Sequence, residues 1–151
     1  FLASIVTLGL STIAIGSAEL LGESTTALFG DKIGLKRATA AGLVITAIAY
    51  FFLPIIGRTL PLAMSGMFFI FIAFEFTMVT SFSLCTELLP ERRATMMAGF
   101  YAMAGIGRMI GVVIGGFLWS AGGINAVSWL SAATTLLALV SLLWGLKNWQ
   151  R

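Results

Sequence analysis

The segment Asp31-Lys32-Ile33-Gly34-Leu35-Lys36-Arg37 interrupts an otherwise apolar part of the chain with three basic residues, one acid and one glycine. Apolar sequence precedes it from Leu2 to Phe29 and follows it from Ala38 to Ile56. Each apolar stretch is long enough for one membrane crossing, because a transmembrane helix needs about 20 residues. The segment therefore predicts a short polar loop between two transmembrane helices, and it decides the fold class.

The same pattern continues along the rest of the chain. Short polar breaks divide it into five predicted helices, at about 2–29, 38–56, 62–85, 94–119 and 125–146. The composition agrees, since 59% of residues are apolar and 10% are charged, whereas about 25% are charged in soluble domains. A soluble globular fold is excluded. We expect an all-α, polytopic membrane protein with five transmembrane helices, forming a single membrane domain over residues 1–151.

The counts of reactive residues narrow the possible chemistry. The chain has no histidine and one cysteine, Cys85. These counts exclude most general-base and metal-ligand schemes, and they exclude an internal disulfide. The formal charge of +3 belongs to the loops between apolar helices, where it does not indicate nucleic acid. We therefore expect no enzyme activity, no cofactor, no metal and no nucleic-acid partner.

Basic residues gather on one side of the predicted membrane frame. That side holds Lys32, Lys36, Arg37, Arg92, Arg93, Lys147 and Arg151, and the opposite side holds Arg58. Because cytoplasmic loops are enriched in lysine and arginine, we expect the loops near 30–37 and 86–93 to be cytoplasmic. The C-terminus is then cytoplasmic, Phe1 lies outside, and the protein resides in the cytoplasmic membrane.

Four ionisable residues fall inside the predicted spans: Glu19, Glu23, Glu75 and Arg108. A charge at mid-membrane costs at least about 2.5–3.5 kcal/mol, so each should face protein or water. We expect Arg108 to pair with one carboxylate and another carboxylate to carry a coupling proton. Glu19 is favoured for the proton, because Glu75 matches the depth of Arg108 more closely. Alternatively, the charges only hold helices together.

Small residues indicate which helices pack closely. Gly107, Gly111 and Gly115 recur at four-residue spacing, and Gly116 follows directly. Such a ridge removes side chains from one helix face and lets another backbone approach. These glycines therefore predict helix packing beside Arg108. The stretch 38–56 contains few hydroxyl groups, so we expect it at the periphery of the helix bundle.

Three motifs carry a resemblance to a known family. The loop 31–37 resembles the D-[RK]-x-G-[RK]-[RK]-[RK] loop of the major facilitator superfamily, with Leu35 where a basic residue is usual and Ala27 in place of an upstream glycine. Residues 107–116 resemble its GxxxGPxxGG motif, with Val112 in place of proline. Residues 87–93, Glu-Leu-Leu-Pro-Glu-Arg-Arg, resemble its E-[LF]-x-P-x-x-R run. The motifs together cover about residues 16–120.

The resemblance implies five helices of a six-helix half, and we expect helices eight to twelve of twelve. Two features favour this C-terminal half: the stretch 62–85 contains no arginine, and the chain ends just after its last helix. The implied function is secondary active transport of a small solute by alternating access, as a proton-coupled antiporter working in efflux. The implied partners are the solute, H+, the lipid bilayer and missing helices of the same polypeptide.

The resemblance also implies roles for the loop 31–37. Asp31 would cap the start of a helix in the partner half, where a carboxylate complements the helix dipole. Lys32, Lys36 and Arg37, held around Gly34, would join ion pairs that close the cytoplasmic gate. The alternative function is an oligomeric membrane scaffold or channel subunit, in which the buried charges serve helix assembly only.

Overall fold

The computed structural model describes residues 5–149, except for the side chain of Asp31. The elements are α1 (Ile5–Ile33), α2 (Leu35–Ile56), α3 (Leu60–Leu88), a short 3-10 turn η1 (Pro90–Arg92) and α4 (Arg93–Gly145). No strand occurs in the described residues, and the all-α fold class is confirmed. The four α-helices are long and apolar enough to cross a membrane. The predicted helix start at Leu2 lies outside the described residues.

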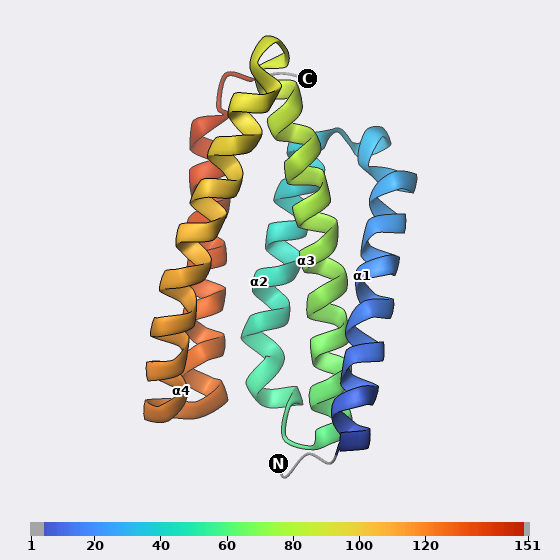
Figure 1. Cartoon of the computed structure of the whole chain (residues 1–151), viewed down its shortest axis with the longest axis vertical. Helices are drawn as coiled ribbons and strands as arrows, with labels where there is room; N and C mark the ends of the chain where they lie inside the picture. The colour runs from blue at the N-terminus through green and yellow to red at the C-terminus, as the bar shows by residue number, and fades with distance from the viewer. Residues whose placement is uncertain (1–4, 150–151) are drawn as a thin grey trace.

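Helix α4 is two helical segments joined at one glycine. It contains 53 residues and would be about 80 Å long if straight, far more than a bilayer core of about 30 Å. Gly123 breaks it with φ 59° and ψ −147°, a backbone conformation that favours glycine. Figure 1 shows the chain reversing there, so that the two parts of α4 run side by side. Helix α4 thus contains the predicted stretch 94–119 and all but the last residue of the predicted stretch 125–146.

The break between α1 and α2 is shorter than the loop predicted at 30–37. Only Gly34 lies between the two helices, and it has φ 88°. Charged side chains such as Lys32 and Lys36 are compatible with a helix, so the helices continue through them. The positive φ at Gly34 is what ends α1, because other residues rarely adopt it. Helix α3 likewise continues past the predicted end at Cys85, to Leu88, just before Pro90.

The helices lie in a row rather than around one centre (Figure 1). Helices α1 and α4 form the two edges, and α2 and α3 lie between them. Helix α2 packs against both α3 and α4. Its buried residues are small: Ala38, Thr39, Gly42, Thr46 and Ala47. Within residues 5–149, therefore, the stretch 38–56 does not have the peripheral position that its plain sequence predicted.

The charged ends of the helices separate along the long axis of the bundle. Figure 1 places the α1–α2 junction, the α3–α4 junction and the end of α4 at one end. The start of α1, the α2–α3 turn and Gly123 lie at the other. The basic residues Lys32, Lys36, Arg37, Arg92, Arg93 and Lys147 therefore share one end of the molecule, and Arg58 lies at the opposite end.

Candidate functional site

Three carboxylates lie on the two helices that pack together as α1 and α3, Glu19 and Glu23 on α1 and Glu75 on α3. Glu19 and Glu75 each lie near the middle of their helices and are half-buried, whereas Glu23 is exposed. Glu19 and Glu23 are both close enough to Glu75 for their negative charges to repel it. The described residues provide none of the three with an ion-pair partner. The interface therefore gathers like charge on two helices that are long and apolar enough to cross a membrane, where a charge is costly.

Gly22 holds this interface together by bringing two backbones close. A Cβ atom placed on Gly22 would lie 2.7 Å from the Cβ of Glu75 and 2.9 Å from the carbonyl oxygen of Ile72. No side chain fits there without moving α1 away from α3. The position of Glu75 is thus tied directly to the contact between the two helices.

The close contact continues toward the basic end of the bundle. One turn after Gly22, the Thr26 hydroxyl is 3.5 Å from the carbonyl oxygen of Phe76, to which it donates a hydrogen bond across the interface. One turn further on, a Cβ on Gly30 would lie 3.9 Å from Cγ2 of Thr80. Gly22, Thr26 and Gly30 form a small-residue ridge, here called the α1 ridge. Small residues at this spacing permit close helix packing in membranes.

Arg108 does not join the carboxylates. It is exposed on α4, and the structure shows no ion pair between it and Glu19, Glu23 or Glu75 within residues 5–149. Helices α1 and α4 lie at opposite edges of the row (Figure 1). The network expected from similar depth is therefore not formed in this part of the chain. Depth along a helix says nothing about which side of the bundle a residue occupies.

The glycine ridge of α4, Gly107, Gly111 and Gly115, is open. A Cβ on any of the three, or on Gly116, would have no neighbour within 4 Å beyond the helix's own nearby backbone. A groove of about 380 Å³ lies between this ridge and the second part of α4, where it is lined by Val127, Leu130, Ser131 and Thr134. That these glycines pack against another helix remains a prediction.

The basic residues of the predicted loop 31–37 differ in burial. Lys32 is exposed, with its amine 5.9 Å from the centre of the Phe29 ring, and Arg37 is exposed. Lys36 is half-buried and donates hydrogen bonds to the carbonyl oxygens of Leu146 and Trp149. A lysine at the C-terminal end of a helix satisfies free carbonyls and complements the helix dipole. Lys36 thus ties the start of α2 to the end of α4.

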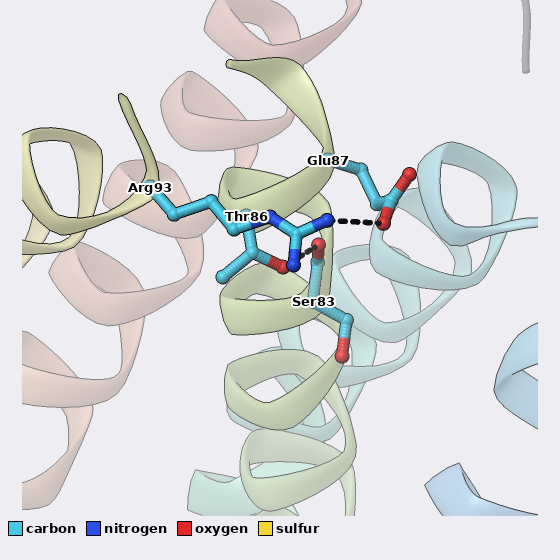
Figure 2. A network of polar contacts seen from close by, with 4 residues as sticks. All are labelled: Ser83, Thr86, Glu87 and Arg93. Carbon is cyan, nitrogen blue, oxygen red and sulfur yellow. Dashed lines mark hydrogen bonds and ion pairs between the residues drawn. The ribbon is translucent and has the colours of Figure 1, made fainter. Parts of the chain in front are cut away.

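The α3–α4 junction carries a polar network, which Figure 2 shows from close by. The Arg93 guanidinium lies 3.8 Å from a carboxylate oxygen of Glu87, and both side chains are partly exposed. The Thr86 hydroxyl donates a 2.8 Å hydrogen bond to the carbonyl oxygen of Ser83. The ion pair joins the last turn of α3 to the first residue of α4. At this exposure it contributes about 0–1 kcal/mol.

Among residues 5–149, no group of three or more His, Cys, Asp and Glu side chains is arranged to hold a metal ion. The assembled features are membrane-length apolar helices, a mid-membrane carboxylate cluster and one strongly basic end. They define a polytopic, integral membrane protein.

The chain belongs to the Major Facilitator Superfamily, because the model of that family matches residues 1–148. No match was found to a curated protein or to a solved structure. The family consists of membrane transporters, so the protein is an integral membrane transporter for a small-molecule substrate and works in a lipid bilayer.

Two features of the site were not found from the sequence. The α1 ridge was missed because it mixes glycine with threonine. Its three small residues nevertheless recur every fourth position, and this spacing could have indicated a packed helix face. The contact of Lys36 with Leu146 joins residues far apart in the chain. No local pattern predicts that contact.

Proposed function

We propose that this chain is part of a secondary active transporter that couples proton movement to the export of a small solute by alternating access. The observation that supports the proposal is that Glu19 and Glu23 on α1 lie near enough to repel the charge of Glu75 on α3, the helix against which α1 packs. A carboxylate that binds and releases a proton inside the membrane is the group that proton coupling requires. The efflux direction rests on the resemblance of the motifs alone.

Glu75 is our choice for the coupling residue. Like charges in a low-dielectric region repel, and a bound proton removes both the repulsion and the cost of burying the charge. Glu75 lies directly at the helix contact, with its Cβ against Gly22, and Glu19 and Glu23 are both near enough to repel its charge. The preference for Glu19 assumed that Arg108 would neutralise Glu75, and that pair is not found in the described residues.

The α1 ridge offers a route from protonation to movement. Because Gly22 places the backbone of α1 against the Cβ of Glu75, a change of charge at Glu75 acts directly on the packing of the two helices. Parallel repeats of transporters rock about a site near the middle of the membrane. We propose that proton binding at Glu75 shifts the α1–α3 contact between the two states of this cycle.

The test is proton-driven uptake by the complete transporter in proteoliposomes. A panel of radiolabelled sugars, amino acids and lipophilic cations is screened first, and the solute that responds to a pH gradient is kept. We expect Glu75→Gln to lower gradient-driven uptake at least tenfold while solute exchange persists, because glutamine holds one protonation state. Glu91→Gln, the same change at an exposed residue of η1, should stay within twofold of the unchanged protein.

Normal gradient-driven uptake in both Glu75→Gln and Glu19→Gln would reject proton coupling by this cluster. Loss of folding in both variants, with recovery when Arg108 is also neutralised, would instead support the scaffold alternative. A buried ion pair is costly when one partner is lost and neutral when both are removed.

The orientation is a separate proposal. The protein lies in the cytoplasmic membrane, and the basic end of the bundle faces the cytoplasm. The excess of Lys and Arg at that end supports it. In a Cys85→Ser background, a cysteine at Lys32 should react with an impermeant maleimide only from the cytoplasm, and one at Ser120 only from outside. Reaction of both from the same side would contradict the orientation and the five crossings.

We also propose that the five membrane segments are helices eight to twelve of a twelve-helix transporter, so that the remaining helices are partners. Asp31, Lys32, Gly34, Lys36 and Arg37 would then form the cytoplasmic gate with the other half. The order of the three motifs along the chain supports this assignment.

A further inference from the structure

Within residues 5–149, three buried hydroxyl groups form no hydrogen bond, and all lie on α2 or on a helix packed against it. Thr39 and Thr46 are on α2, and Ser128 is on α4. The three residues, here called the enclosed hydroxyls, are 2%, 4% and 2% exposed. A buried hydroxyl without a partner raises the free energy of the packing that encloses it.

Neighbouring hydroxyls show what these three lack. Thr77 on α3 donates a 2.6 Å hydrogen bond to the carbonyl oxygen of Ala73, and Thr135 on α4 donates a 2.7 Å bond to that of Ser131. Such bonds within one helix are usual for serine and threonine inside helices. The enclosed hydroxyls are therefore exceptions, and buried polar groups without a partner are rare enough to require a physical reason.

Nothing outside these helices can supply the missing partners while the packing holds. The three oxygen atoms are already covered by α2 and the helices packed against it. A lipid, a solute or a further helix would therefore touch only the outer surface of this packing. A partner can come only from within these helices, or from water that enters when they separate.

The contact between α2 and α3 is too close to admit water beside the two threonines. Gly42 lies between Thr39 and Thr46 in the chain, and a Cβ atom on Gly42 would overlap the Thr77 hydroxyl and lie 3.2 Å from Cδ1 of Phe76. A water molecule needs a void of its own, and a contact that cannot accept one carbon atom does not provide it.

Ser128 is held against the other side of α2. The ring of Trp129, the next residue, packs on the ring of Phe51 of α2 with 5.2 Å between ring centres. Aromatic pairs at this separation are favourable. Both helix contacts of α2 therefore exclude water in the packing described here.

We propose that this packing of α2 is the water-excluded state of a helix interface that opens to water in another state of the transport cycle, an inference that rests on the proposed alternating access. The enclosed hydroxyls gain hydrogen bonds to water in the open state and lose them in the closed state. They thus keep the closed state from becoming too stable to leave. A change that favours one of two states shifts their populations.

The first test compares two valine substitutions on facing helices of the complete transporter. Valine replaces the threonine hydroxyl by a methyl group of similar shape. Thr46→Val removes a hydroxyl without a partner, so it should raise the midpoint of SDS-induced unfolding. Thr77→Val removes a bonded hydroxyl at a similarly buried position and should not raise it. A midpoint that does not rise in Thr46→Val, or that rises equally in Thr77→Val, would overturn the proposal.

The second test follows water at Ser128 directly. In a Cys85→Ser background, Ser128→Cys in the detergent-solubilised complete transporter is treated with 2-(trimethylammonium)ethyl methanethiosulfonate, whose fixed charge confines it to water. Mass spectrometry follows labelling of the peptide that contains residue 128. The thiol should react, and adding Thr46→Val should slow the reaction about fivefold or more, because it lowers the population of the open state. Adding Thr77→Val should leave the rate within about twofold.

The reagent is checked with Ser120→Cys, which lies at an exposed position. A Ser128→Cys variant that stays unlabelled while Ser120→Cys reacts would overturn the proposal. So would a rate that Thr46→Val leaves unchanged, or one that Thr77→Val slows equally. Labelling requires neither a solute nor a pH gradient. Failure of the opening can therefore be told apart from failure of proton-coupled transport, which the uptake of Glu75→Gln measures.

Discussion

Helices α1 and α4 both carry small residues at four-residue spacing, yet only one of these ridges is packed. The α1 ridge of Gly22, Thr26 and Gly30 lies against α3, with two backbones in close contact at Gly22. The more regular ridge of Gly107, Gly111 and Gly115 on α4 meets no close neighbour in the described residues. The spacing of small residues therefore shows that a helix can be approached, and it does not show what approaches it.

The difference has a physical cause. In a membrane the hydrophobic effect does not drive helices together, so association depends on close packing and on hydrogen bonds between helices. The α1 ridge has both, because the Thr26 hydroxyl reaches the carbonyl oxygen of Phe76. The α4 ridge offers shape alone, beside an exposed arginine, Arg108.

The largest effect is expected from a methyl group at the packed ridge. Gly22→Ala places a Cβ against the Cβ of Glu75 and the backbone oxygen of Ile72, and a backbone atom cannot rotate away. We expect a loss of roughly 1–3 kcal/mol in the free energy of unfolding, as for other overpacked sites. SDS-induced unfolding followed by circular dichroism measures it. An unchanged midpoint would show that α1 and α3 do not pack as described.

A second contrast of packed and open positions involves the two loop lysines. Lys36 donates to the carbonyl oxygens of Leu146 and Trp149, whereas the amine of Lys32 lies over the Phe29 ring. Lys36→Gln should weaken the end of α4 by about 0.3–1 kcal/mol, the usual contribution of a cation at a helix C-terminus.

Hydrogen exchange of the amides near residue 146 measures this change. The expected loss corresponds to roughly two- to fivefold faster exchange. Lys32→Gln is the matched control and should leave these amides unchanged. Equal acceleration in both variants would show that general loop charge, rather than the bonds of Lys36, protects the end of α4.

The smallest effect is expected at the open ridge. Gly111→Ala adds a methyl group with no neighbour within 4 Å, so the free energy of unfolding should not fall by more than about 0.5 kcal/mol. The same SDS titration as for Gly22→Ala measures it. A loss as large as that of Gly22→Ala would contradict an open ridge and would make the two ridges equivalent.

Much of the fold was predictable from local sequence. The apolar stretches predicted the helices, since no other backbone structure in a single segment satisfies its own hydrogen bonds in lipid. The break predicted between residues 119 and 125 contains Gly123, where α4 reverses. The helix ends were less predictable, because the chain around Lys32 and Lys36 remains helical where its charge suggested a loop.

The candidate site was predictable only in part. Burial cost singled out Glu19, Glu23 and Glu75 without any structure, and the structure places Glu19 and Glu23 near enough to Glu75 to repel its charge. The partner expected for them, Arg108, lies on a helix at the other edge of the row. The enclosed hydroxyls around α2 were not predicted, because their burial depends on helices packed from elsewhere in the chain.

The sequence by itself determined the class of this protein: its apolar helices, the concentration of basic residues at one end, and the cost of its mid-membrane charges. These are properties of single segments in a known solvent, the bilayer. Only the tertiary structure decided which small-residue ridge is packed, which charges lie near one another and which hydroxyl groups are enclosed. Those outcomes depend on the rotation and order of neighbouring helices, which no single segment encodes.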